Sequence, residues 1–148
     1  MEMKNNQTVN NIPLYVQEQT LKKCFPTSYT QRFEKKEFLS WKGKIRPSTL
    51  SNEYTILIKL QKKKIEVFVI EPKKLMLFSS ETKLPHVYST KKQILCLFYP
   101  DGKQWNRGKL IVNSIIPWTS EWLYFYEIWL ITGEWLGGGT VHQKLNNT

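Results

Sequence analysis

A cysteine and a histidine lie close together in an apolar stretch of this chain, where their side chains could do chemistry. Cys96 stands between two leucines, and His86 precedes it by ten positions. A cysteine thiolate is a nucleophile, and a nearby histidine can accept the thiol proton. Lys91, Lys92 and Lys103 flank the cysteine, and positive charges lower the pKa of a thiol. We therefore expect Cys96 to be reactive and partly exposed.

Two other interpretations of Cys96 stay open. A cysteine between leucines is often only a small buried hydrophobic residue. The thiol could also serve a papain-like hydrolase, with His86 or His142 as its base. The Pro-Asp-Gly turn at 100–102 favours exposure of the neighbouring segment. Cys24 lacks these features at the end of a helical pattern, and we expect it in the core.

The remaining residues give little support for a metal or a bound cofactor. The chain has 2 cysteines and 2 histidines, without the C-x-x-C or H-x-x-x-H spacing of zinc sites. The glycine-rich stretch "GEWLGGG" follows an apolar helical pattern instead of preceding one, so it is not expected to cradle phosphates. We expect no metal site and no cofactor.

The composition predicts a single cytoplasmic domain. A chain of 148 residues is long enough for one hydrophobic core. Residues 1–10 are polar and are expected to be disordered or frayed, whereas residues 11–148 form the domain. No cleavable apolar segment opens the chain, and polar residues interrupt its most apolar region, 115–131. Neither export nor contact with a membrane is therefore predicted.

The net charge of +10 makes nucleic acid or an acidic protein surface a natural partner. The lysines come in short clusters, most of them where turns are expected, which favours solvated loops over a stripe that follows phosphates. A basic nucleic-acid-binding module stays open as an alternative, with Trp41, Tyr88 and Trp105 as stacking surfaces.

Two helices are predicted, one near each end of the chain. Residues 11–24 have helical spacing, with Asn11 as the capping residue. The second helix begins near Thr119, with Thr119 or Ser120 as its cap, and ends at Gly133. This helix is apolar almost all round, so its large aromatic side chains should be buried, notably Trp118, Trp122 and Trp129.

Between these helices, alternating apolar residues predict strands. The pattern recurs three times and is followed by a short apolar piece, which together indicate an antiparallel meander over about 38–78. The three strands are expected at 38–46, 53–60 and 64–72, and the apolar piece covers 75–78. Alternation then stops between 79 and 105, which places Cys96 in an irregular segment of the kind where functional sites often occur.

The irregular segment resembles the active site of ubiquitin-conjugating enzymes. These enzymes have a His-Pro-Asn motif, a loop and then Ile-Cys-Leu, and this chain reads "LPHVYS" and then "LCLFYPDGKQW". With the tryptophan-rich block "IIPWTSEWLYFYEIWLITGEWLGGGTVH", the likeness is closer to bacterial relatives encoded in anti-phage cyclic-oligonucleotide signalling (CBASS) operons. It covers roughly residues 41–142. The block is its specific part, because a lone histidine and cysteine at this spacing would mean little.

The resemblance implies an α+β fold of the ubiquitin-conjugating type: an N-terminal helix, a four-stranded antiparallel meander, an active-site loop and a C-terminal helix. It makes Cys96 the thioester-forming nucleophile and His86 the motif histidine, which in eukaryotic members mainly holds the loop. Tyr88 stands where the motif has its asparagine, so the Tyr88 hydroxyl, Asn106 or a backbone amide must stabilise the oxyanion. The candidate substrate-binding residues are Tyr88, Trp105 and Asn106.

The resemblance also implies partners for a cysteine-dependent acyl (ubiquitin-like) transferase. The acyl donor would be the C-terminus of a cGAS-like nucleotidyltransferase from the same operon, and an unidentified acceptor protein would receive it. Nothing in the chain resembles an adenylating domain, so activation must come from elsewhere. A catalytically silent member of the same fold, acting as a binding or regulatory protein, is the other alternative.

Overall fold

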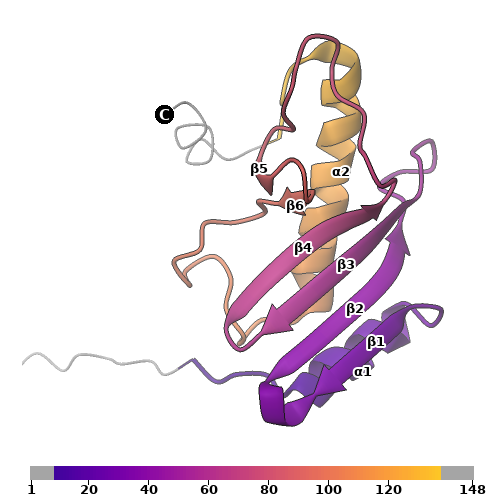
Figure 1. Ribbon diagram of the computed structural model, residues 1–148. Helices are drawn as coiled ribbons and strands as arrows, with labels where there is room; N and C mark the ends of the chain where they lie inside the picture. Colours follow the sequence, from indigo (N-terminus) through magenta and orange to yellow (C-terminus); the bar gives the residue numbers. More distant parts are fainter. Residues whose placement is uncertain (1–8, 138–148) are drawn as a thin grey trace, which may run out of the picture.

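The computed structural model describes residues 9–137, which form an antiparallel sheet with helices against one of its faces (Figure 1). The strand order is β1-β2-β3-β4-β6-β5. The elements are α1 (Leu14–Cys24), β1 (Tyr29–Phe33), η1 (Glu34–Lys36), β2 (Phe38–Ile45), β3 (Tyr54–Gln61), β4 (Lys64–Glu71), β5 (Val87–Ser89), β6 (Ile94–Leu95), η2 (Ile111–Asn113) and α2 (Ile115–Thr132).

The α+β class and the predicted meander are confirmed, but the meander occupies 29–71 instead of 38–78. Its first strand, β1, escaped prediction because four of its five side chains are exposed and no alternation marks it. The piece 75–78 is not a strand. It lies against α2, where the Tyr126 hydroxyl donates to the Met76 carbonyl oxygen at 2.7 Å.

The core lies between the sheet and the helices, on the face that alternation predicts. Along β3 the buried residues are Tyr54, Ile56, Ile58 and Leu60, and along β2 they include Leu39, Trp41 and Ile45. Residues at alternate positions of a strand point to one face, so this pattern gives the sheet one apolar face. Helix α2 covers that face and lies behind the sheet in Figure 1. The irregular segment packs against the same helix.

Helix α2 begins four residues earlier than the sequence indicates. Pro117 lies in its first turn, where an N–H has no helical partner and proline is tolerated. Thr119 is therefore inside the helix and buried, and its hydroxyl donates to the Ile115 carbonyl oxygen at 2.7 Å. The expected caps at Thr119 and Ser120 are wrong; the N-cap is Ser114, without a capping hydrogen bond from its side chain.

The other end of α2 agrees with the sequence. Gly133 adopts a left-handed conformation with φ of 77° and its N–H donates to the Trp129 carbonyl oxygen, as expected of a glycine that ends a helix. Trp122 and Trp129 are buried as predicted, whereas Trp118 is only half-buried. Neither helix in the part of the chain described is long and apolar enough to cross a membrane.

Helix α1 differs from prediction at both of its ends. Its N-cap is Pro13, so the expected cap at Asn11 is wrong. Its last residue, Cys24, is exposed and does not belong to the core. The buried face of α1 ends at Leu21, and the next apolar residue, Phe25, occupies the space against Trp41, with ring centroids 5.2 Å apart.

Candidate active site

A short hairpin brings Cys96 beside His86. Strands β5 and β6 pair in antiparallel fashion, with Val87 opposite Leu95. The residues just outside this pair are His86 and Cys96, and the Cys96 N–H donates to the His86 carbonyl oxygen at 3.1 Å. His86 has a φ of 47°, a left-handed value that is uncommon outside glycine. The ten-position spacing in the sequence therefore becomes direct contact in the fold.

The Cys96 thiol is half-buried next to the Tyr88 hydroxyl. Its sulfur lies 3.9 Å from the Phe98 carbonyl oxygen, to which the Tyr88 hydroxyl donates at 3.2 Å. Burial raises the pKa of the Cys96 thiol, and the hydrogen bond with Tyr88 lowers it only in part. The net shift is upward, which is opposite to the lowering expected from the neighbouring lysines, because removal of water penalises the thiolate.

Cys96 opens into a pocket of about 430 Å³ between the irregular segment and α2. Its walls are mostly aromatic, and Gln104 and Glu121 line it together with Cys96 and His86. The aromatic side chains are those of Phe98, Trp118, Trp122, Phe125 and Trp135. A small pocket of this kind can surround an acyl group while two polar side chains meet the atoms that react.

His86 is the structural centre of this pocket. Its side chain is 6% exposed and stacks on the Trp135 ring, with centroids 4.9 Å apart and planes at 26°. Its carbonyl oxygen also accepts from Nε1 of Trp122 at 3.0 Å, in addition to the Cys96 N–H. His86 thus joins the cysteine strand to α2 through its backbone and to the following loop through its ring.

A comparison with protein families identifies the family of this chain. A family model described as Type II CBASS E2 protein matches residues 17–143. The chain belongs to this family. The search of curated proteins found no match. Membership implies an E2-like role in anti-phage CBASS and partners from the same operon, and it suggests ubiquitin-like transfer as the reaction class.

The candidate substrate-binding residues of this E2-family chain gather around a second cavity. Tyr88, Trp105 and Asn106 all line it, and Tyr88 alone of the three also contacts the Cys96 thiol. Trp105 is buried, and its Nε1 donates to Oγ of Ser114 at 3.0 Å. The Asn106 side chain binds the Gly102 carbonyl oxygen and the Gly108 N–H, at 3.2 and 2.9 Å.

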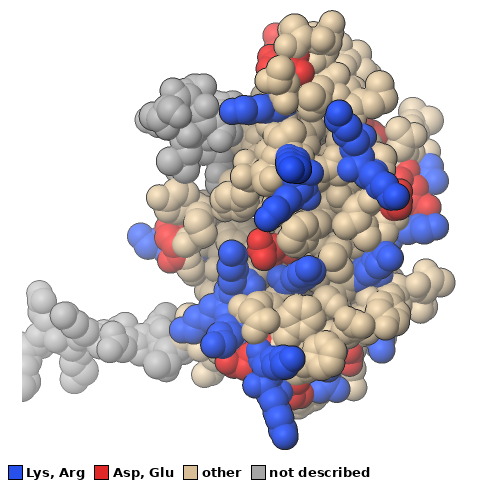
Figure 2. Space-filling view, viewed as in Figure 1, with Lys and Arg blue, Asp and Glu red and all other residues tan. Residues whose placement is uncertain are grey.

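Two of the three stacking surfaces of the nucleic-acid alternative are not available, and Tyr88 alone of the three is exposed, at 58%. Trp41 and Trp105 are 1% and 3% exposed, so neither can offer a ring face to a base. Figure 2 shows Lys and Arg side chains spread over the viewed face with acidic side chains among them. The other proposed histidine, His142, lies outside the described residues, as does most of the segment 1–10.

Glu121, Gln104 and Trp135 were missed as site residues by the sequence analysis. Glu121 looked like an acidic residue of the first helical turn, but α2 begins at Ile115, so Glu121 lies in the second turn and lines the pocket. Pro117 was the available signal, since proline favours the first turn of a helix. With that start, Trp118, Glu121, Trp122 and Phe125 share one helical face. For Trp135 the sequence carries no comparable signal.

Proposed function

We propose that this chain is a cysteine-dependent acyl transferase that forms a thioester through Cys96. The donor is the C-terminus of a partner protein, a cGAS-like nucleotidyltransferase encoded with it, and the product is that C-terminus joined to an acceptor. One observation carries the choice of residue: the Cys96 thiol lies between a hydroxyl donor and an aromatic pocket, whereas Cys24 is exposed at the end of α1.

The first step loads the acyl group. The Cys96 thiol loses its proton, and the sulfur attacks the carbonyl carbon of a C-terminus that another protein has activated as an acyl adenylate. A carbon–sulfur bond forms, the bond to the adenylate oxygen breaks, and AMP leaves. In the second step an amine attacks the thioester, a carbon–nitrogen bond forms and Cys96 leaves as a thiolate. The Tyr88 hydroxyl, hydrogen-bonded to the thiol, is placed to stabilise that thiolate.

We assign Glu121 the removal of the proton from the attacking amine. An amine is a nucleophile only when it is neutral, so a base beside the thioester speeds its attack. Glu121 supplies the carboxylate among the residues that line the Cys96 pocket. His86 is assigned a positioning role, which its buried, stacked ring and its doubly hydrogen-bonded carbonyl oxygen support.

The raised pKa of Cys96 favours a second candidate function, a catalytically silent binding or regulatory protein of the same fold. A thiol with a raised pKa gives less thiolate at neutral pH, which slows attack. The absence of the motif asparagine acts in the same direction. The transferase forms a covalent bond between Cys96 and the donor, whereas the silent protein does not. The intact mass of the chain therefore distinguishes the two candidates.

The test is the intact mass of the chain after co-expression with its neighbouring operon proteins. The transferase predicts an adduct equal to the partner mass minus one water, attached at Cys96 and released by hydroxylamine. A Cys24→Ser variant serves as the matched control and should form the same adduct. A folded wild-type chain that binds the partner but gains no mass would support the silent protein instead.

A further inference from the structure

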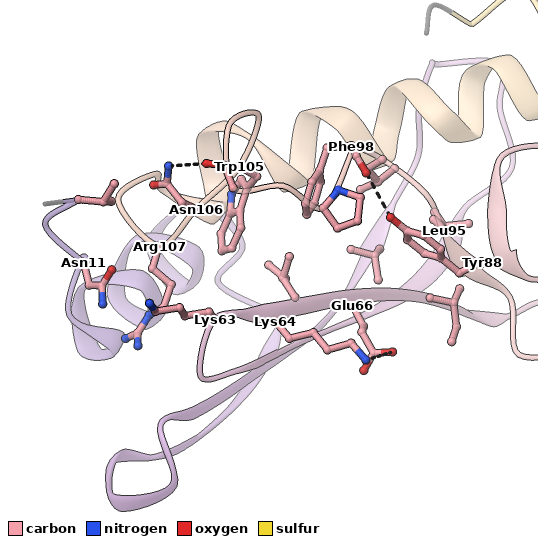
Figure 3. Close-up of a pocket in the computed structure, with 17 residues that line it drawn as sticks. Asn11, Lys63, Lys64, Glu66, Tyr88, Leu95, Phe98, Trp105, Asn106 and Arg107 are labelled. Carbon is pink, nitrogen blue, oxygen red and sulfur yellow. Dashed lines mark hydrogen bonds and ion pairs between the residues drawn. The ribbon is translucent and has the colours of Figure 1, made fainter. Parts of the chain in front are cut away.

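A cavity of about 1050 Å³ lies between β4 and the loop that follows Cys96 (Figure 3). Ile65 and Val67 line it from β4, and Phe98 and Trp105 line it from the loop. In the close-up, Arg107 and Lys63 lie at one end of the cavity, and Tyr88 and Leu95 lie at the other. The cavity is therefore elongated along β4.

The part of β4 beside this cavity is an open strand edge. On one side β4 pairs with β3 along its whole length. On the other side, within the described residues, β6 pairs with it at Phe68 alone, and the Val69 N–H donates to the Gln93 carbonyl oxygen at 3.1 Å. Backbone groups alternate in direction along a strand, so those of Ile65 and Val67 also point away from β3. Ile65 is partly exposed whereas Val67 is 2% exposed, so an extended peptide could pair with the backbone of Ile65.

The end of the cavity far from Cys96 is basic. Lys63 and Lys64 line it from the turn before β4. Arg107 is only 8% exposed, and its Nε has no hydrogen-bond partner among the residues that the structure describes. Glu37 lies 3.4 Å from Nη1 of Arg107, and Glu66 lies 3.9 Å from Lys64. Because Lys63 and Lys64 are exposed, a carboxylate of a bound chain could pair with them and balance the positive charge.

The opposite end leads to the reactive sulfur. Leu95 and Leu97 line the cavity and are the two neighbours of Cys96 in the sequence. The Tyr88 hydroxyl, which is hydrogen-bonded to the Cys96 thiol, belongs to a side chain that lines the same cavity. Cys96 itself lines the smaller pocket, and Leu97 and Phe98 line both that pocket and this cavity. A chain end that lies in the cavity can therefore pass Tyr88 and reach the thiol where the two spaces adjoin.

We propose that this cavity binds the C-terminal tail of the acyl donor as an added strand, parallel to β4. This inference rests on the proposed function. The last residue of the tail lies at Cys96, and an acidic side chain lies at Arg107 and Lys63. Lys63 precedes Phe68 by five positions, and Phe68 pairs with Ile94 close to Cys96, so that acidic side chain stands about five residues before the end of the tail. Tyr88 and Asn106 then contact the tail between these points, whereas the buried Trp105 supports the cavity wall.

Binding is measured apart from chemistry by using the Cys96→Ala chain, which cannot be acylated. The probe is a synthetic peptide of the last ten residues of the operon's nucleotidyltransferase, labelled for fluorescence anisotropy. We expect the double variant Lys63→Glu/Lys64→Glu to weaken binding at least tenfold. Lys73→Glu/Lys74→Glu, which makes the same charge change in the turn after β4, is the matched control and should leave the affinity unchanged.

The strand pairing has its own variant. Ile65→Pro removes an N–H that points into the cavity and leaves the hydrogen bonds of β4 with β3 in place, since proline is accepted at strand edges. Ile65→Val keeps that N–H and is the control. We expect loss of peptide binding in Ile65→Pro with an unfolding midpoint close to that of Ile65→Val. If Ile65→Pro fails to fold, the paired lysine variants decide.

The outcomes separate this inference from the proposed function. If the wild-type chain forms the thioester and neither the lysine nor the proline variant slows it, the function stands and the tail site is wrong. If the peptide binds as expected but no adduct ever forms on Cys96, the tail site stands and the transferase is wrong. If a single-stranded oligonucleotide displaces the peptide at equal concentration, the cavity binds nucleic acid and the tail site is wrong.

Discussion

The meander β1–β4 and the segment that carries Cys96 are stabilised by different kinds of interaction. In the meander, neighbouring strands share a repeated ladder of backbone hydrogen bonds, and β2, β3 and β4 each bury a row of side chains on one face. In the segment 79–114, individual side chains hold the backbone. Gln93 alone binds the Leu75 N–H and the carbonyl oxygens of Val69 and Pro72.

This difference separates stability from chemistry. Removal of one apolar side chain from the meander leaves a cavity but keeps the ladder, so the strands stay where they are. Removal of one side chain from the segment leaves buried backbone groups without partners, and the segment must rearrange to satisfy them. Substitutions in the meander should therefore change the free energy of unfolding, whereas substitutions in the segment should change the thioester rate as well.

The largest expected effect comes from Cys96 itself. Cys96→Ala should abolish the covalent complex completely and leave the unfolding midpoint almost unchanged, because the thiol is only half-buried. Cys96→Ser should trap the donor as an oxyester, which amines attack much more slowly than a thioester. Both are measured by intact mass and denaturing gel. An adduct that persists in Cys96→Ala and disappears in Cys24→Ser would show that the thioester forms on Cys24 and not on Cys96.

The second prediction compares the two regions directly. Ile58→Ala, in the middle of β3, should lower the free energy of unfolding by about 2–5 kcal/mol without changing the thioester rate of the folded chain. Gln93→Ala should also lower stability, by about 1–3 kcal/mol for a buried polar group left without a partner, and should slow thioester formation. Urea unfolding and single-turnover loading give the two quantities.

Gln61→Ala is the matched control for Gln93→Ala. Gln61 is exposed, and its side-chain amide donates to the Lys36 carbonyl oxygen at 2.7 Å. The Gln61→Ala variant therefore loses a hydrogen bond that water can replace. We expect little change in either measurement. An equal loss of loading rate in Gln61→Ala, or in Ile58→Ala, would mean that the segment is not held separately from the meander.

The third prediction concerns His86. The pH dependence of the loading rate distinguishes a positioning residue from a base. His86→Ala removes the ring stacked on Trp135 and should reduce the loading rate at every pH, with a lower unfolding midpoint. A base would instead give the wild-type rate a step near the ordinary histidine pKa of about 6.5. A wild-type profile that rises through this range, becomes flat in His86→Ala and leaves the unfolding midpoint unchanged would reassign His86 as the base.

The smallest effect is expected from Tyr88→Phe. The Tyr88 hydroxyl lowers the pKa of the Cys96 thiol against the larger rise caused by burial, so its loss should raise that pKa further. Below the pKa, less thiolate remains at a given pH, and alkylation of Cys96 by iodoacetamide should slow by about two- to tenfold. The Cys24→Ser background isolates the Cys96 signal. An unchanged or faster rate at pH 8 would remove Tyr88 from the proposed stabilisation of the thiolate.

Wild-type alkylation is expected to contradict the order indicated by the sequence. Cys24 was expected in the core and Cys96 was expected to be partly exposed with a lowered pKa. Cys96 is partly exposed, but Cys24 is exposed as well and burial raises the pKa of Cys96. A small alkylating reagent should therefore modify Cys24 first, although the proposed chemistry belongs to Cys96. Selectivity for Cys96 comes from its pocket and from the tail that the pocket receives, and not from the acidity of its thiol.

The α+β class, the apolar face of the sheet and the end of α2 at Gly133 could all be predicted from the sequence. Each depends on local regularities: alternation along β2, β3 and β4, helical spacing and a glycine that accepts positive φ. The contact of His86 with Cys96 was indicated only by resemblance to a family, since nine intervening residues fix no distance. Strand β1 and the true start of α2 were missed because their local patterns are weak.

The sequence by itself determined which residues could react and which face of the sheet is buried, because those depend on side-chain chemistry and on periods of two or 3.6 residues. Only the tertiary structure decided that Tyr88 lies against the Cys96 thiol, that Glu121 faces the pocket and that Cys24 is exposed. The physical reason is that these contacts join segments with no shared periodicity. The β5–β6 hairpin is positioned by Gln93 and Trp122, through hydrogen bonds to backbone atoms that any residue could supply.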